Sequence, residues 1–289
     1  MDSPASKDRI LGCLFGGAIG DALGGPYETR TPPFEIDSNA EWVLSDDTQL
    51  TMATCDAIVR TGRVDPGEIA AEFVRWFRAR RLTGLGSSTL KALRDLDAGA
   101  HWGSSGAEGE RAAGNGAAMR IAPLAFCLDP IRTSARTTIR DTCRITHRND
   151  EAYTGALAIL FAIHDNDPSL LPDTRVREVI EEHAGRGNER SIANTAREIG
   201  TSGYVAESVP LAIVAARQVD AIGFEQTMLE IVRAGGDTDT IASMAGQIAG
   251  AKLGYKDLPS QLVERLPERD LIETTAHRFA DFILGGQRG

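Results

Sequence analysis

Two short acidic segments carry the residues of this chain best suited to bind a cation or to handle protons. Ser45–Thr48 (SDDT) follows a stretch without periodicity and opens a helical pattern, and Gly235–Thr240 (GGDTDT) opens another near the end of the chain. Each segment also fits a helix N-cap, because Ser and Asp accept bonds from the free N–H groups of a first turn and acidic side chains suit the helix dipole. Taken alone, each segment is more readily structural than functional.

Taken together, the two segments indicate a metal site. If their helices pack closely, Asp46, Asp47, Asp237 and Asp239 converge, and four clustered carboxylates are unstable unless they are protonated or bound to cations. Oxygen ligands favour Mg²⁺, Mn²⁺ or Ca²⁺, and two ions about 3.5–4 Å apart suit this many ligands. A DxDxT phosphatase motif is disfavoured because it follows a hydrophobic strand, whereas Arg-Ala-Gly-Gly precedes the aspartates here.

The helices that must bring these segments together are rich in small residues. The first, Ile10–Leu23, has four glycines within an apolar helical pattern, although each glycine costs a helix about 1 kcal/mol relative to alanine. The second, Ile241–Leu253, carries Gly246 and Gly250. We therefore expect the two ends of the chain to meet in one core, with the two helix backbones very close.

Nearly all of the chain between them is expected to be helical. Periodic apolar faces predict helices over Leu50–Val59, Pro66–Leu82, Ala118–Leu128, Thr133–Ile145, Glu151–Ile163, Arg175–Ala184, Val205–Ala216, Phe224–Val232 and Leu271–Leu284. Pro26–Leu44 and Gly99–Gly116 are expected to be loops, which at this length in a compact domain are usually functional or disordered. No alternating run predicts a strand and no long period indicates a solenoid, so the predicted fold class is all-α.

Composition excludes several classes of protein. The 289 residues carry 31 Lys and Arg against 41 Asp and Glu, a formal net charge of −10, with 42% hydrophobic residues. The chain is therefore globular rather than disordered, and its acidic balance argues against nonspecific nucleic-acid binding. Four cysteines without a CxxC pair indicate buried thiols in a reducing compartment. Ile10–Gly20 is too short to span a membrane and lacks a positive flank, so we expect a cytoplasmic protein without membrane contact.

Six blocks of sequence, in order, resemble the ADP-ribosylglycohydrolase family, which includes dinitrogenase reductase-activating glycohydrolase and the ADP-ribosylhydrolases. The blocks are GCLFGGAIGDALGGPYE (12–28), SDDTQLT (45–51), GNGAAMRIAPLA (114–125), THRND (146–150), GTSGYVAESVPLA (200–212) and GGDTDTIASMAGQIAGAKLG (235–254). The resemblance covers residues 8–285 and leaves 1–7 as a short N-terminal tail. It implies an all-α fold, a single compact orthogonal helical domain, around two divalent ions, Mg²⁺ or Mn²⁺.

The resemblance also implies roles for individual residues. Glu28 matches a glutamate on a mobile loop near the metals and the scissile bond, and Glu28 and Asp46 are the expected catalytic carboxylates. The metal ligands implied are Ser45, where the family usually has threonine, with Asp46, Asp47, Asp237, Asp239 and Thr240. The residues implied to bind ADP-ribose are Asn115, Gly116, His147, Ser202, Gly203 and Tyr204.

Several of these residues have structural interpretations that the sequence leaves open. Asn115 and Gly116 can form a plain helix-entry turn, and His147 can be a structural histidine. Tyr204 can be a core anchor rather than a residue that stacks near adenine. Asp21, at the edge of an apolar helix face, must find partners, and we expect it to support the metal loops from behind.

One segment departs from the family pattern. Many bacterial members carry an Asp-x-Gly segment after the third helix, with the aspartate implicated in catalysis, whereas Thr83–Thr89 stands there and Gly84 replaces the acid. This segment therefore lacks the carboxylate that those members are thought to use in catalysis. Its absence leaves open which residue acts as the catalytic base and whether arginine linkages are preferred.

The predicted function is release of ADP-ribose from a modified acceptor, such as an arginine of an ADP-ribosylated protein, by a monomer that does not bind nucleic acid. The alternatives are a noncatalytic ADP-ribose-binding protein, a hydrolase of small-molecule or nucleic-acid conjugates, and the immunity partner of an ADP-ribosylating toxin.

Overall fold

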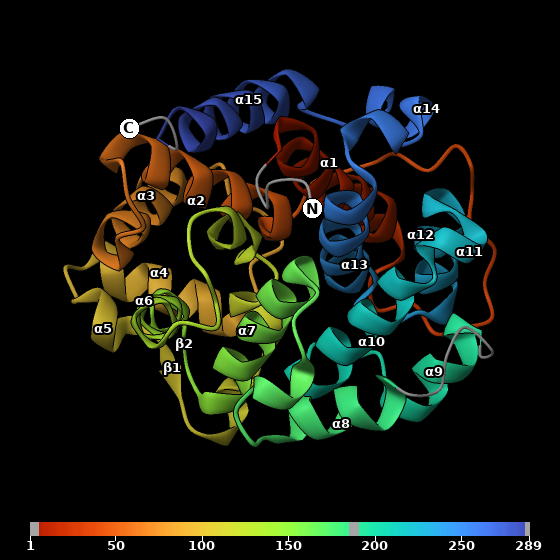
Figure 1. The fold of residues 1–289 in the computed structure, drawn as a ribbon, viewed down its shortest axis with the longest axis horizontal. Coiled ribbons are helices and arrows are strands. Elements are labelled where there is room, and N and C mark those ends of the chain that lie inside the picture. The colour runs from red at the N-terminus through yellow and green to blue at the C-terminus, as the bar shows by residue number, and fades with distance from the viewer. Residues whose placement is uncertain (1–5, 185–190, 287–289) are drawn as a thin grey trace.

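The structure, a computed structural model that describes residues 6–184 and 191–286, is built almost entirely of helices (Figure 1). The prediction of an all-α fold is confirmed. The α-helices are α1 (Lys7–Gly24), α2 (Asp46–Thr61), α3 (Pro66–Arg78), α4 (Ser87–Asp97), α5 (Trp102–Ser105), α6 (Thr133–Arg144), α7 (Asp150–His164), α8 (Arg175–Ala184), α9 (Ile192–Ile199), α10 (Val205–Arg217), α11 (Val219–Ile222), α12 (Phe224–Ala234), α13 (Thr238–Leu253), α14 (Ser260–Glu264) and α15 (Arg269–Gly286). Most of the expected tail at 1–7 lies outside the described residues, and the domain bounds stay a prediction.

The α1–α13 pair forms the centre of the fold and confirms the expected contact between the ends of the chain. Figure 1 shows the two helices side by side, with α15 packed beyond α1. A Cβ atom added at Gly16 would overlap the carbonyl oxygen of Gly246, and one added at Gly12 would overlap that of Gly250. The glycines are therefore required because two backbones touch. The antiparallel pairing places the last turn of α1 beside the first turn of α13, where Gly24 meets Asp239.

The prediction of a helix over Ala118–Leu128 is wrong. The segment forms two 3₁₀ turns, η3 (Asn115–Ala117) and η4 (Ala122–Phe126), joined by a hydrogen-bonded turn. Pro123 explains the difference, because inside an α-helix its ring would clash with the carbonyl of Met119 and its missing N–H would leave that carbonyl unpaired. The Met119 carbonyl instead accepts a 2.6 Å hydrogen bond from the Gln247 side chain.

Other local differences are smaller. The helices α4 and α9 were not predicted, because serines and other polar residues interrupt their short apolar patterns. Gly99–Gly116 is largely irregular but contains α5 and a two-residue strand, β1 (Ala107–Glu108), which pairs in parallel with β2 (His147–Arg148). Pro26–Leu44 is a loop apart from the 3₁₀ turn η1 (Gly25–Tyr27).

The cysteines and the membrane prediction are also tested by the structure. All four cysteines are free thiols, and Cys13, Cys55 and Cys143 are buried, as the sequence analysis expected of their side chains. In the described part of the chain, no helix combines the length and the apolar character needed to cross a bilayer.

Candidate active site

Asp21 ties the start of α2 to the last turn of α1. Its carboxylate is fully buried and accepts hydrogen bonds from the backbone N–H of Ser45 (3.1 Å), the Ser45 hydroxyl (2.8 Å) and the backbone N–H of Thr48 (3.1 Å). The Ser45 hydroxyl in turn accepts from the N–H of Asp47, which is the N-cap bond expected of this segment. The N-cap interpretation is therefore correct for Ser45, where a buried acid from another helix orients the cap, whereas Asp237 at the start of α13 makes no side-chain cap bond.

The two acidic segments meet at this point. Thr240, in the first turn of α13, donates a 3.1 Å hydrogen bond to Asp47 Oδ2. One carboxylate oxygen from each of Asp21, Asp47 and Asp239 lies within 4.8 Å of the other two, and so do oxygens from Glu28, Asp237 and Asp239. Asp239 belongs to both groups, so two carboxylate clusters share one residue.

Burial and mutual repulsion dominate the electrostatics of these clusters. Burial raises the pKa values of Asp46 and Asp47 well above the usual range, and neighbouring carboxylates raise them further. Burial, followed by the charges of Asp237 and Glu28, raises the pKa of Asp239 to about 8. Burial also raises the pKa of Asp237, although a hydrogen bond from Asn115 opposes this rise. Without a counter-charge, the clusters hold protons near neutral pH.

The donor set suits divalent cations. Asp47 Oδ1 and Asp239 Oδ1 are buried and have no hydrogen-bond partner among the described residues. An unpaired buried carboxylate oxygen is costly unless a cation binds it, and an all-oxygen set of carboxylates and hydroxyls is typical of Mg²⁺ or Mn²⁺ sites. The residues present therefore fit the metals that the sequence analysis expected.

The six expected ligands do not all lie in the same place. Asp47, Asp237 and Asp239 belong to the two clusters. The Thr240 hydroxyl donates to Asp47 Oδ2, and the Ser45 hydroxyl oxygen lies 3.0 Å from the same atom. Asp46 belongs to neither cluster and lines the adjacent cleft. Asp21 also belongs to a cluster, although the sequence analysis expected it only to support the metal loops. Its place in the helical pattern of α1 does not show which acids from other segments surround it.

Backbone contacts fix the loop that carries Glu28 to the start of α13. The N–H of Thr29 donates to the Gly236 carbonyl (2.7 Å), and the N–H of Gly236 donates to the Arg30 carbonyl (3.2 Å). Gly236 has φ +83°, and a side chain there would overlap Thr201. The Glu28 carboxyl, which is partly exposed, thus faces Asp237 and Asp239, and burial followed by the charge of Asp237 raises its pKa.

A cleft of 510 Å³ opens from the acidic clusters toward the glycine-rich loop. Its walls come from segments far apart in sequence: Glu28, Thr29, Asp46, Gly84, Gly86, Ser87, Ser88, Thr89, Arg111, Gly114, Asn115, Gly116, Met119, His147, Ser202, Gly203, Gly236, Asp237, Asp239 and Thr240. The expected ligand residues Asn115, Gly116, His147, Ser202 and Gly203 therefore lie together with Glu28 and three of the acids.

The expected ligand residues differ in how free they are. The Asn115 side chain donates to Asp237 Oδ2 (2.6 Å) and to the Ser208 hydroxyl (3.2 Å), so it holds an acid in place. The Ser202 hydroxyl is bonded to Glu207. Tyr204 is 39% exposed at the end of the same loop, so it is not a core anchor.

Two residues that line the cleft, Gly84 and Arg111, affect the space beside the acids and the charge of the ligand that the cleft can accept. Gly84 has φ +71°, and a Cβ atom there would lie 3.2 Å from Ser45 Cβ and 3.6 Å from Asp46 Oδ1. Any side chain at this position would thus border the acids. Arg111 is exposed and is the one basic Lys or Arg side chain among the described residues that line the cleft. A lone arginine in a Gly- and Ala-rich loop was its only signal in the sequence.

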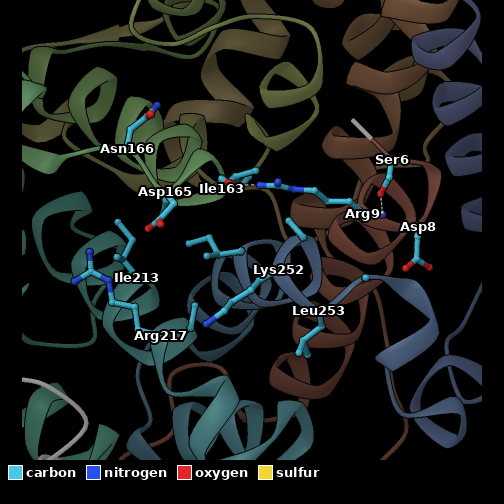
Figure 2. A pocket seen from close by; sticks show the side chains of 15 residues that line it. Ser6, Asp8, Arg9, Ile163, Asp165, Asn166, Ile213, Arg217, Lys252 and Leu253 are labelled. Carbon is cyan, nitrogen blue, oxygen red and sulfur yellow. Dashed lines mark hydrogen bonds between the residues drawn. The ribbon is translucent and has the colours of Figure 1, made fainter. Parts of the chain in front are cut away.

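A second cavity of similar size, 520 Å³, lies at the other end of the α1–α13 pair (Figure 2). Three of its charged side chains already have partners: Asp8 accepts from the N–H of Lys256, Arg9 donates to the Ile163 carbonyl, and Lys252 pairs with Asp220. Neither carboxylate cluster borders this cavity, so the chemistry of the molecule concentrates in the first cleft.

Comparison with known proteins agrees with this geometry. A family model for ADP-ribosylglycohydrolase matches residues 2–288. The chain is 27% identical to the ADP-ribosyl-[dinitrogen reductase] glycohydrolase of Rhodospirillum rubrum over 98% of both chains. It is 29% identical to an ADP-ribosylarginine hydrolase of Pseudomonas putida over 95% of this chain and 78% of that protein. A solved structure described as an ADP-ribosylglycohydrolase-related protein complex aligns with a TM-score of 0.70 and 25% identity, over 96% of this chain and 98% of that one. The chain therefore belongs to the ADP-ribosylglycohydrolase family and is a hydrolase.

Proposed function

We propose that this protein hydrolyses the bond between C1″ of ADP-ribose and a protein side chain, with arginine as the acceptor. The observation that carries the proposal is the pair of unpartnered buried oxygens, Asp47 Oδ1 and Asp239 Oδ1, at acidic clusters beside a glycine-lined cleft. Arginine is chosen because one relative is named an ADP-ribosylarginine hydrolase.

The clusters would hold two divalent ions, Mg²⁺ or Mn²⁺. The proposed ligands are Ser45, Asp46, Asp47, Asp237, Asp239 and Thr240, with Asp21 fixing the Ser45 end. When bound, such ions supply positive charge to an anionic ligand, orient its sugar hydroxyls and lower the pKa of a bound water. The local charge at the cleft then has the opposite sign to the net charge of the chain.

Glu28 is the proposed general base. Its carboxyl faces the two acids of the second cluster, and burial with the charge of Asp237 raises its pKa toward the range in which a carboxylate accepts a proton well. Glu28 takes a proton from the attacking water as the water oxygen bonds to C1″, and the proton then passes to the departing acceptor atom as its bond to C1″ breaks. Asp46, which lines the same cleft, is the second proposed catalytic carboxylate, and its negative charge would stabilise the positive charge that develops on the sugar.

The cleft also gives the ligand a place for its remaining groups. Gly114, Gly116 and Gly203 line the cavity without side chains, so an anion can approach the backbone closely. Arg111 borders the same cavity and supplies a charge for the diphosphate. Tyr204 is exposed at the end of the adjoining loop, where its ring is available to stack on adenine.

The test is release of ADP-ribose from an ADP-ribosylarginine peptide, with serine-linked, nucleobase-linked and small-molecule conjugates measured in parallel. We expect turnover with Mg²⁺ or Mn²⁺, no turnover in chelator, and loss of at least about 100-fold in Asp47→Asn, because a metal ligand is removed. Asp220→Asn is the control, since Asp220 is exposed and pairs with Lys252 on the surface.

Other outcomes would replace the proposal. ADP-ribose binding without turnover on any linkage would identify a noncatalytic binding protein. Turnover confined to nucleobase or small-molecule conjugates would move the activity to those substrates, and full activity of Asp47→Asn would refute the metal site.

A further inference from the structure

Arg120 is a fully buried arginine that lies behind the cleft. Its guanidinium lies over the ring of Phe73, 4.9 Å from the centroid. One nitrogen, Nη2, donates to the Thr142 carbonyl (3.3 Å) and to the Thr146 hydroxyl (2.8 Å). Nε and Nη1 have no partner among the described residues. Burial lowers the pKa of Arg120 only to about 10, so the side chain is charged at neutral pH. Burying a charged guanidinium with two unpaired nitrogens is unfavourable, so a functional role for this side chain is expected.

The Thr146 hydroxyl connects Arg120 to the cleft. Its oxygen lies 2.9 Å from His147 Nδ1, and both residues are buried. A guanidinium can only donate, so the Thr146 oxygen accepts from Arg120. Of the two side chains that contact the Thr146 hydroxyl, Arg120 and His147, only His147 Nδ1 can accept its single proton. If Nδ1 carried a proton instead, the hydroxyl proton would be buried without an acceptor, which is strongly disfavoured.

His147 is therefore held in one tautomer. A neutral imidazole whose Nδ1 accepts a hydrogen bond carries its proton on Nε2. Burial, followed by the charge of Arg120, lowers the pKa of His147 to about 3, so the ring stays neutral at physiological pH.

The Nε2 edge of this ring faces the glycine loop of the cleft. A Cβ atom added at Gly114 would lie 3.2 Å from Nε2, and one added at Gly116 would lie 2.8 Å from the neighbouring Cε1. The two glycines therefore pack closely against the ring, which is buried but still lines the cleft at this edge. Arg111 borders the same cavity, so a cation and a neutral N–H donor both face the space in which an anionic group would lie.

We infer that Arg120 and Thr146 are positioning residues that hold His147 as an Nε2–H donor aimed into the cleft, where it bonds an anionic oxygen of the ligand. The identity of the ligand, the diphosphate of ADP-ribose, rests on the proposed function. The tautomer itself does not, because it follows from the hydrogen bonds of the protein alone.

Nitrogen NMR of the histidine side chains in the metal-loaded protein tests the tautomer, with His147 assigned by comparison with His147→Gln. In the wild type, Nδ1 should resonate as an unprotonated nitrogen and Nε2 as a protonated one between pH 6 and 8. Thr146→Val removes the hydroxyl and should move both resonances toward averaged values, whereas Thr146→Ser should restore them. Thr142→Val is the matched control, because the Thr142 hydroxyl bonds to the Thr138 carbonyl in the same helix and its own carbonyl still accepts from Arg120.

Calorimetry with ADP-ribose tests the consequence for binding. We expect Thr146→Val to bind about tenfold more weakly than the wild type, Thr146→Ser and Thr142→Val. A wild-type His147 that is cationic or protonated on Nδ1, or unchanged nitrogen resonances in Thr146→Val, would overturn the inference. If the wild type binds no ADP-ribose, the proposed function and the assigned ligand are wrong, while the nitrogen resonances still decide the positioning role.

Discussion

Removing one carboxylate from the acidic clusters should make the metal-free protein more stable at pH 8. The pKa of Asp239 is about 8 in the folded chain, against an ordinary value of 3.8. The folded state therefore holds this proton more tightly than the unfolded state. The stability linked to it is complete below about pH 4 and is lost as the pH rises toward 8. Asp239→Asn is neutral at every pH and escapes this loss.

The expected size follows from the pKa. A rise from 3.8 to about 8 corresponds to at most about 5–6 kcal/mol. Because Asp237, Glu28 and Asp21 share the charge, relaxation of the cluster lowers this figure, and we expect Asp239→Asn to gain about 1–4 kcal/mol relative to the wild type between pH 5 and 8. Burial lowers the pKa of His147, which gives an opposite slope below about pH 6.5. His147 is present in both proteins, so the difference between them isolates Asp239.

Urea unfolding in chelator at pH 5, 6, 7 and 8 measures this difference. Asp270→Asn is the control, because Asp270 is an exposed acid in the first turn of α15, as Asp239 is in the first turn of α13. It should change stability by less than about 0.5 kcal/mol at any pH. Added Mn²⁺ should stabilise the wild type more than Asp239→Asn. A difference that is flat with pH, or a variant less stable than the wild type at pH 8, would refute the reasoning.

Three other predictions concern glycines and the exposed tyrosine. Gly16→Ala should destabilise the protein by about 3 kcal/mol or more, because its methyl group would overlap the Gly246 backbone. The control Gly285→Ala, which has open space around it, should instead stabilise the protein by about 0.5–1 kcal/mol. Thermal unfolding measures both changes, and equal effects would contradict the α1–α13 contact. Gly84→Ala should lower the free energy of unfolding by about 1 kcal/mol, because the backbone there has φ +71°. It should also lower kcat/KM severalfold, because the added methyl group lies close to Ser45 and Asp46. Unchanged stability and kinetics would show that the loop does not hold Gly84 in this position. Tyr204→Ala should leave the free energy of unfolding unchanged and weaken ADP-ribose binding at least about tenfold, whereas Tyr204→Phe should bind like the wild type. If Tyr204→Ala is less stable than the wild type, Tyr204 is a core anchor after all.

Local chemistry explains which expectations held. An N-cap such as Ser45 depends on neighbours within three residues, so its pattern predicted the α2 start correctly. The glycine spacing of α1 and α13 reports the approach of another backbone and predicted the central helix pair. Pro123 is a local signal against a helix over 118–128, although the apolar residues around it follow a helical pattern.

Long-range contacts explain what the sequence analysis missed. Asp21 meets Asp47 and Asp239 only because the end of α1 and the starts of α2 and α13 lie at one place, and no spacing along the chain encodes that meeting. Asn115 lines the cleft, and its side chain also donates to Asp237, more than a hundred residues away, a contact that no local pattern indicates.

The sequence by itself determined the helical class, the two acidic helix starts and the close contact between the glycine-rich helices α1 and α13. Each of these depends on periodicity or on hydrogen bonds between close neighbours along the chain. Only the tertiary structure decided which carboxylates share a cluster and which of their oxygens remain unpaired. These properties depend on distances of a few ångströms between segments from opposite ends of the chain, and those distances are set by how the whole core packs.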